Sequence, residues 1–184
     1  MTIHPGKLIF LALADTYEAS GDHEGAASLL ERALKRHKKS KKVWMRYQLL
    51  RIKQNEERKA KELLSRSLQA LSRHKHVEVI SRYALAEFEY GSVDRARVLF
   101  EELLSSYPKR SDLWHVYVDK EIKLGNITEA RRLFERMEAA KFSAHNMRTV
   151  FKKHLSFENQ FGTTEDQQRV KEAARAYVSQ QSQQ

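Results

Sequence analysis

The strongest constraint on this chain is a pattern that returns at nearly even intervals along its length. Each copy has two amphipathic segments with apolar residues at helical spacing, separated by one turn residue. The turn residues are Gly21, Asn55, Gly91, Gly125 and Gly162, which stand 34, 36, 34 and 37 residues apart. Eleven positions before each turn lies a bulky residue: Phe10, Trp44, Ile80, Trp114 and Phe151. Since neither helix of a pair can bury its apolar stripe alone, the pattern predicts an all-α fold, a right-handed α-solenoid of about five helix-turn-helix repeats.

A period near 34 residues with two helices per unit is typical of tetratricopeptide-like (TPR-like) repeats. The expected repeats are 7–38, 42–73, 76–107, 111–140 and 144–178, forming one continuous solenoid over 7–178. The expected helices are 7–19, 22–35, 42–54, 56–71, 77–90, 92–106, 111–124, 127–139, 144–161 and 165–178. Residues 1–6 are expected to be a disordered tail or a segment left over from the expression vector, and residues 179–184 are expected to be a polar tail.

The turns carry local signals of their own. The four turn glycines suit a left-handed residue that stops a helix, and Asn55 is the next-best choice. Asn126 is expected to cap the following helix, with Glu129 three residues later completing a capping box. The first helix opens with the apolar residues Phe10, Leu11 and Leu13, and no polar capping helix precedes it in this sequence. We therefore expect further repeats upstream, with self-association through this open end as a possible consequence.

The repeat positions also predict the core. Ten residues are expected to form the repeat core: Phe10, Trp44, Tyr47, Ile80, Tyr83, Phe100, Trp114, Tyr117, Phe134 and Phe151. For the two tryptophans and three tyrosines among them, the fixed register in successive first helices favours the core over base-stacking platforms. A glutamate recurs seven positions after the bulky residue, at Glu87, Glu121 and Glu158. A contact between helices with a base such as Arg97 or Arg131 explains these glutamates better than paired catalytic carboxylates do.

Several function classes find no support in the sequence. The chain has no cysteine, so cysteine nucleophiles, disulfides and cysteine-based zinc sites are excluded. His74 and His76 flank Lys75, but no third metal ligand is evident. No phosphate-binding glycine loop, nucleophile–base grouping or 18-residue apolar run occurs. We expect no enzyme activity, no cofactor, no metal site and no membrane partner.

Charge is distributed unevenly between the two kinds of loop. The net charge is +10, and the loops between repeats carry eleven bases and no acid, whereas the turns within repeats are mainly acidic. Bases at helix ends complement the helix dipole, which explains the short loops but not six bases within the run KRHKKSKK. Ten of these bases are candidate RNA-binding or partner-binding residues, and we call them together the basic edge: Lys35, Arg36, Lys38, Lys39, Lys41, Lys42, Arg73, Lys75, Lys109 and Arg110.

One repeat resembles a known motif closely. Trp114, Tyr117 and Glu121, then Gly125, then the run ARRLFER (130–136) are similar to a HAT repeat, the tetratricopeptide variant of RNA-processing proteins. The segments 76–125, 147–163 and 170–178 resemble the C-terminal HAT domain of one family. It is that of the large S1-repeat ribosomal RNA-processing proteins, which includes programmed cell death protein 11. The first and last repeats depart from the motif, with Leu13 and His154 in place of the tyrosine.

The resemblance implies part of a larger nucleolar protein. We expect a scaffold that joins assembly factors of the small-subunit processome and precursor rRNA during early small-subunit rRNA processing in the nucleus. The alternative is a purely protein-binding HAT scaffold of mRNA splicing or 3′-end processing.

Overall fold

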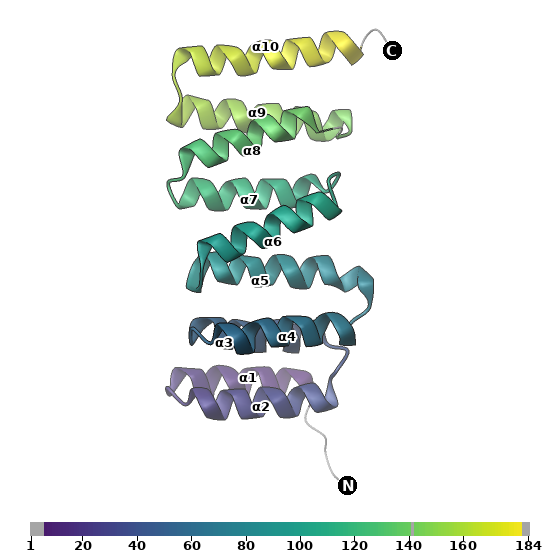
Figure 1. Cartoon of the computed structure of the whole chain (residues 1–184), viewed down its shortest axis with the longest axis vertical. Helices are drawn as coiled ribbons and strands as arrows, with labels where there is room; N and C mark the ends of the chain where they lie inside the picture. The colour runs from purple at the N-terminus through teal and green to yellow at the C-terminus, as the bar shows by residue number, and fades with distance from the viewer. Residues whose placement is uncertain (1–5, 141, 182–184) are drawn as a thin grey trace. The chain divides into compact units, whose positions relative to one another are not determined.

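The computed structural model describes residues 6–140 and 142–181, and within them the chain is all-α (Figure 1). The described part contains one 3-10 turn, η1 (Arg73–Lys75), and no strand. Its ten α-helices are α1 (Lys7–Ala19), α2 (His23–Arg36), α3 (Lys41–Lys53), α4 (Glu57–Ala70), α5 (His76–Tyr90), α6 (Val93–Ser106), α7 (Ser111–Lys123), α8 (Ile127–Ala139), α9 (Ala144–Phe161) and α10 (Thr164–Gln181). The predicted fold class, a solenoid of paired helices, is confirmed.

The chain divides into two compact units, residues 1–103 and 104–184, which we call unit 1 and unit 2. The predicted grouping into five repeats of one continuous solenoid stays a prediction. The expected tails lie mostly outside the described residues, as does Lys141, the eleventh base of the loops between repeats. Within the described part, α10 continues to Gln181, three residues beyond the expected end. No described helix is long and apolar enough to cross a membrane.

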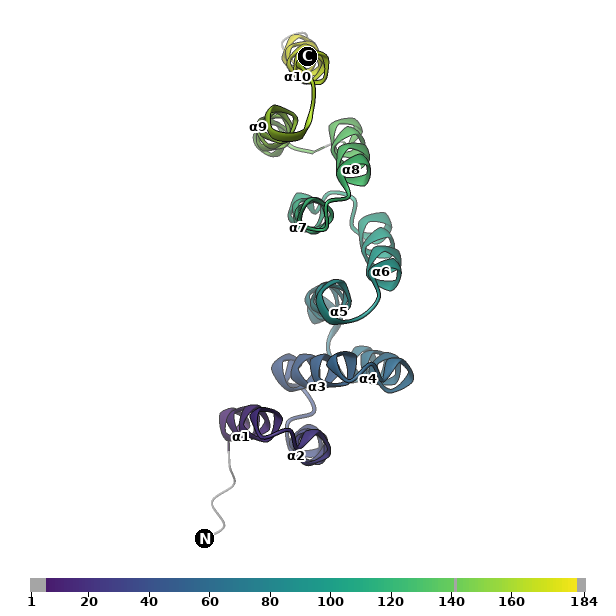
Figure 2. The same ribbon diagram turned by 90° about the vertical axis from the view of Figure 1, so that its left-hand side faces the viewer.

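In unit 1, helices that follow one another in sequence pack as neighbours, and the first helices of successive pairs also touch. Helix α3 contacts α1, α2, α4 and α5, so it occupies the centre of this unit (Figure 2). A core around Trp44 and Tyr47 continues into Leu30, Leu50 and Val79. Because α1, α3 and α5 lie side by side, their outward faces form one continuous surface.

In unit 2, each of the four helices contacts the next along the chain. Phe134 of α8 packs against Phe157 of α9, with ring centroids 5.3 Å apart. The ring of His154, also on α9, stacks on Phe134, with ring centroids 4.7 Å apart and an interplanar angle of 6°. Trp114 meets Phe142 edge-on. The α7–α8 and α9–α10 pairs are thus joined through an aromatic cluster between α8 and α9.

The five turn residues fall into two groups, which differ in backbone conformation. Gly21, Asn55 and Gly125 adopt the expected left-handed conformation, with φ of 80°, 57° and 77°. The expectation was wrong for Gly91 and Gly162, whose φ values are −123° and −105°. There a Cβ atom would meet the carboxylate of Glu87 or Glu158, which folds back over the turn. Glycine is required at these two positions because of a close approach rather than a positive φ.

The expected cap at Asn126 forms differently. Asn126 occupies the N-cap position of α8, but its side chain makes no hydrogen bond to the first turn of that helix. Its Nδ2 instead donates to Oε2 of Glu121, at 2.8 Å. Glu121 is fully buried, and a buried carboxylate without partners is costly, so it outcompetes the helix amides for this side chain.

Candidate functional site

The basic edge of unit 1 is built on the connections α2–α3 and α4–α5, which lie at the same edge of the unit (Figure 1). Five of its bases are exposed in and around the first connection: Lys35, Arg36, Lys38, Lys39 and Lys42. The second connection adds exposed Arg73 and half-buried Lys75.

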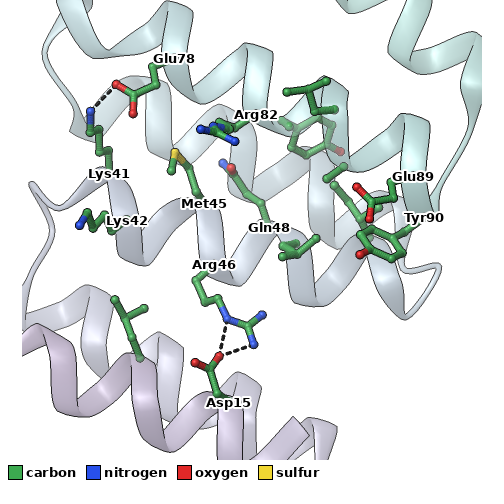
Figure 3. Close-up of a pocket in the computed structure, with 16 residues that line it drawn as sticks. Asp15, Lys41, Lys42, Met45, Arg46, Gln48, Glu78, Arg82, Glu89 and Tyr90 are labelled. Carbon is green, nitrogen blue, oxygen red and sulfur yellow. Dashed lines mark hydrogen bonds and ion pairs between the residues drawn. The ribbon is translucent and has the colours of Figure 1, made fainter. Parts of the chain in front are cut away.

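A hydrogen bond ties the two connections together. Nζ of Lys75 donates to the backbone oxygen of Lys39, at 3.3 Å. Bases separated by more than 30 residues in the sequence therefore lie side by side in unit 1, as a polyanion site requires. Lys41 differs from its neighbours, because it is half-buried and forms an ion pair with Glu78 of α5 (Figure 3).

The conformation of the first connection is fixed by a buried indole. Trp44 is 3% exposed, and its Nε1 donates to the backbone oxygen of Lys38, at 2.8 Å. Trp114 makes the equivalent bond to the oxygen of Pro108, at 3.1 Å. Sequence reasoning assigned both tryptophans to the core and missed this role. The signal was a tryptophan six residues after a loop position in two repeats.

Unit 2 carries the remaining predicted bases, Lys109 and Arg110, in the loop before α7. Both are exposed, but Arg110 grips Asp112 through Nε and Nη2, at 2.8 and 2.7 Å. The Arg110 guanidinium lowers the pKa of Asp112, and the carboxylate raises that of Arg110. This part of the basic edge is therefore partly neutralised, and most of the exposed bases of the basic edge lie in unit 1.

The ten predicted core positions are mostly buried. Phe10, Trp44, Tyr47, Tyr83, Phe100, Trp114, Tyr117 and Phe134 are each at most 8% exposed. Ile80 and Phe151 are only half-buried. Phe151 packs against Tyr177 of α10, with ring centroids 5.8 Å apart. None of the aromatic rings in the buried set presents an open face to a base.

A groove of about 670 Å³ runs over the outward faces of α1, α3 and α5 (Figure 3). Its floor includes Met45 and Leu49, and acids and bases alternate around its rim. Arg46 bridges to Asp15 of α1, at 2.6 Å. Gln48 donates through Nε2 to Ser67, at 3.0 Å, while its buried Oε1 has no hydrogen-bond partner in the described part of the chain. Mixed charge over an apolar floor suits a polypeptide better than a polyanion.

The recurring glutamates are buried, and each has polar partners. Glu158 accepts two hydrogen bonds from Arg131, at 2.7 and 2.8 Å, which confirms the predicted contact between these helices. The same guanidinium lowers the pKa of Glu158. Glu87 accepts from the backbone N–H of Ser92 and from Arg95, a base that the sequence did not single out.

The second repeat reverses the charge at this position. Arg51 lies seven residues after Trp44 and is 5% exposed, with Glu24 at 3.1 Å and Glu56 at 2.5 Å. In these repeats the position therefore holds a buried charged side chain with polar partners, whichever its sign. Such carboxylates are engaged in structure and are not placed as an acid–base pair. Among the described residues no group of three metal-ligating side chains comes together.

The succession of packed helix pairs defines the class of the protein, which is a TPR-like helical-repeat protein. A family model described as tetratricopeptide repeat matches residues 9–52. A solved structure described as a putative kinesin light chain with nearly identical TPR-like repeats, from Podosopora anserina, has a TM-score of 0.51. It is 18% identical and covers 98% of this chain and 99% of its own, which supports the fold alone.

Longer relatives match nearly the whole chain. Protein RRP5 homolog of Mus musculus is 40% identical over 174 residues, or 95% of this chain. The rRNA biogenesis protein RRP5 of Arabidopsis thaliana is 41% identical over 173 residues, or 94%. The chain spans only 9% of the length of each of these relatives. The resemblance to the large ribosomal RNA-processing proteins is confirmed, and the chain is similar to one segment of RRP5.

Proposed function

We propose that this chain is a non-catalytic scaffold of ribosome biogenesis in the nucleolus. It joins assembly factors of the small-subunit processome to precursor rRNA during early small-subunit processing. The observation that carries the proposal is the basic edge of unit 1, where two connections place exposed lysines and arginines side by side. The relatives named for rRNA biogenesis support it.

The basic edge and the groove of unit 1 differ in charge, and they suit different ligands. RNA phosphates are attracted to the basic edge, where the connections α2–α3 and α4–α5 contribute cations and no acid. The groove over α1, α3 and α5 mixes acids such as Asp15, Glu78 and Glu89 with its bases, so it lacks the uniform positive charge that attracts a polyanion. A segment of a partner protein is the ligand that fits this groove, because apolar and charged side chains can both be matched there.

The proposal is tested by reversing the exposed lysines of the first connection. The variant carries Lys38→Glu, Lys39→Glu and Lys42→Glu, and it leaves Lys41 in place because Lys41 pairs with Glu78. We expect weaker binding to single-stranded RNA and a flatter salt dependence, by up to about 2 in the log–log slope for three lost phosphate contacts. The measurement is fluorescence anisotropy over a salt series.

The matched control reverses three other exposed bases, Arg58, Lys123 and Lys171, so that both variants have the same net charge. The control should bind RNA nearly as well as the parent chain. Equal losses in the two variants would mean that only net charge matters. Unchanged affinity and slope in the first variant would contradict RNA binding at the basic edge, and would favour the purely protein-binding scaffold of splicing or 3′-end processing.

A further inference from the structure

Unit 1 has a second cavity beside the basic connection, of about 450 Å³, between α2 and α4. Six of the side chains that line it are Glu31, Lys35, Lys38, Trp44, Arg66 and Gln69. The two lysines belong to the basic edge, whereas Arg66 and Gln69 lie one turn apart on α4. A cavity of this size has room for a small ligand, and it opens beside the surface proposed to bind RNA.

Arg66 is held as a flat platform in this cavity. Its guanidinium carbon lies over the Trp44 ring, 5.6 Å from the centroid, which is within the range of a cation–π contact. Nη2 donates to Oε1 of Glu31, at 2.8 Å, which fixes the side chain laterally. The side chain is still 40% exposed. Because Glu31 already compensates the charge of Arg66, the open face of Arg66 is suited to stacking more than to binding a phosphate.

Two lysines add positive charge to the cavity. Lys35, in the last turn of α2, and Lys38, in the connection that follows, are exposed and line the cavity. Lys38 is positioned by the hydrogen bond from Trp44 Nε1 to its backbone oxygen. Trp44 therefore organises both halves of the cavity, the guanidinium platform on one side and the lysine on the other.

We propose that this cavity binds one unpaired nucleotide of an RNA strand. The base stacks on the open face of the Arg66 guanidinium, the Gln69 amide bonds the edge of the base, and Lys35 and Lys38 hold the adjacent phosphate. Unpaired bases stack readily on arginine planes, and RNA-binding proteins use such contacts to grip single-stranded segments. The inference rests on the proposed RNA binding and assigns it a particular subsite.

Unit 2 contains a natural comparison. Arg136 lies over Trp114, with its guanidinium carbon 5.0 Å from the ring centroid, at the same spacing in the sequence as Arg66 and Trp44. The positions that correspond to Lys35 and Lys38 are Ser105 and Pro108. This second platform lacks both lysines, so we expect no nucleotide to bind there.

The test compares Arg66→Lys with Arg136→Lys, two substitutions that keep the charge and remove the plane. Each is titrated with a short oligouridine and with an oligonucleotide of equal length whose riboses carry no base. Stacking of one base contributes about 1–3 kcal/mol, so Arg66→Lys should weaken oligouridine binding at least fivefold. It should leave the abasic strand and the salt slope unchanged. Arg136→Lys should change neither affinity.

A crosslink gives independent evidence in the unmodified chain. A strand containing 4-thiouridine should crosslink to the α4 segment around Arg66, and Gln69→Ala should lower the yield without affecting folding, because Gln69 is exposed. A crosslink that maps only to other segments would overturn the subsite, even if Arg66→Lys failed to fold.

The remaining outcomes separate the subsite from the proposed function. If Arg66→Lys weakens both strands equally, Arg66 contacts phosphate and the stacking proposal is wrong. If Arg66→Lys has no effect while reversal of Lys38, Lys39 and Lys42 still weakens binding, RNA binding stands and the subsite fails. If an acidic peptide displaces oligouridine from the α4 crosslink at equal concentration, the cavity is a protein site. If the parent chain binds neither strand, the proposed function itself is contradicted.

Discussion

At the scale of single residues, one repeated position decides how charge is buried in this chain. Seven residues after the bulky residue, three repeats place a glutamate and the second repeat places Arg51. The sequence showed the recurrence and indicated a polar contact, and Arg131 indeed pairs with Glu158. It could not show that Arg95 serves Glu87, because the distances depend on how α5 and α6 cross. Nor could it show that Asn126 turns away from its helix toward Glu121.

Glu158 gives the clearest prediction at this scale. Glu158→Gln keeps the shape but leaves Arg131 facing a neutral group, and should reduce the free energy of unfolding at pH 7 by roughly 2–3 kcal/mol. Arg131 lowers the pKa of Glu158 in the folded state, so the carboxylate stabilises the fold above the pKa of the unfolded chain. This contribution is lost as the pH falls through the folded-state pKa. The difference between parent and variant should therefore shrink below about pH 4.5.

Urea denaturation at a series of pH values measures this difference. Glu172→Gln is the matched control, because Glu172 is an exposed glutamate on α10 of the same unit. It should have little effect at any pH. A deficit in Glu158→Gln that stayed constant down to acid pH would show that charge is not what stabilises this position.

At the scale of the secondary-structure elements, sequence pattern was a good guide to helices and a poor one to turns. Apart from the last helix, every predicted end lies within one residue of the observed one, because helix length is fixed by apolar periodicity. The 3-10 turn at Arg73–Lys75 was not predicted, since no periodicity marks three residues. Gly21 and Gly91 looked equivalent in the sequence, yet only Gly21 has a positive φ.

The two kinds of glycine should respond differently to alanine. Gly21→Ala places a side chain in the left-handed region without any clash, which costs about 1–2 kcal/mol. Gly91→Ala instead pushes the Glu87 carboxylate away from Ser92 and Arg95, and we expect a loss of about 2 kcal/mol. Each substitution is combined with Glu87→Ala in a double-mutant cycle, and chemical denaturation measures the stability of every variant. The cycles separate backbone strain from the clash with the Glu87 carboxylate.

In the Glu87→Ala background, most of the cost of Gly91→Ala should disappear, because the clashing carboxylate is gone. The cost of Gly21→Ala should be unchanged, since it belongs to the backbone alone. Additive losses for Gly91 and Glu87 would mean that the glycine is needed for another reason.

At the scale of the whole molecule, the sequence alone gives the net charge of +10. It predicts only in part where those charges lie. Loop composition indicated a basic edge, and in unit 1 the bases of two connections do lie together. The pattern could not reveal which bases are already paired. Glu78 stands 37 positions after Lys41 in the sequence, so their contact depends on how α3 packs against α5.

Crowded cations should make salt act in opposite directions on folding and on RNA binding. In the free chain, Lys35, Lys38, Lys39 and Lys42 repel one another, and added salt screens this repulsion because these side chains are exposed. The melting temperature should therefore rise with salt more in the parent chain than in the variant with Lys38, Lys39 and Lys42 reversed. Over the same range, about 50 to 200 mM, RNA affinity of the parent should fall. Thermal melts and anisotropy on the same samples measure both trends. Equal salt dependence of melting in parent and variant would show that these lysines do not repel one another in the folded chain.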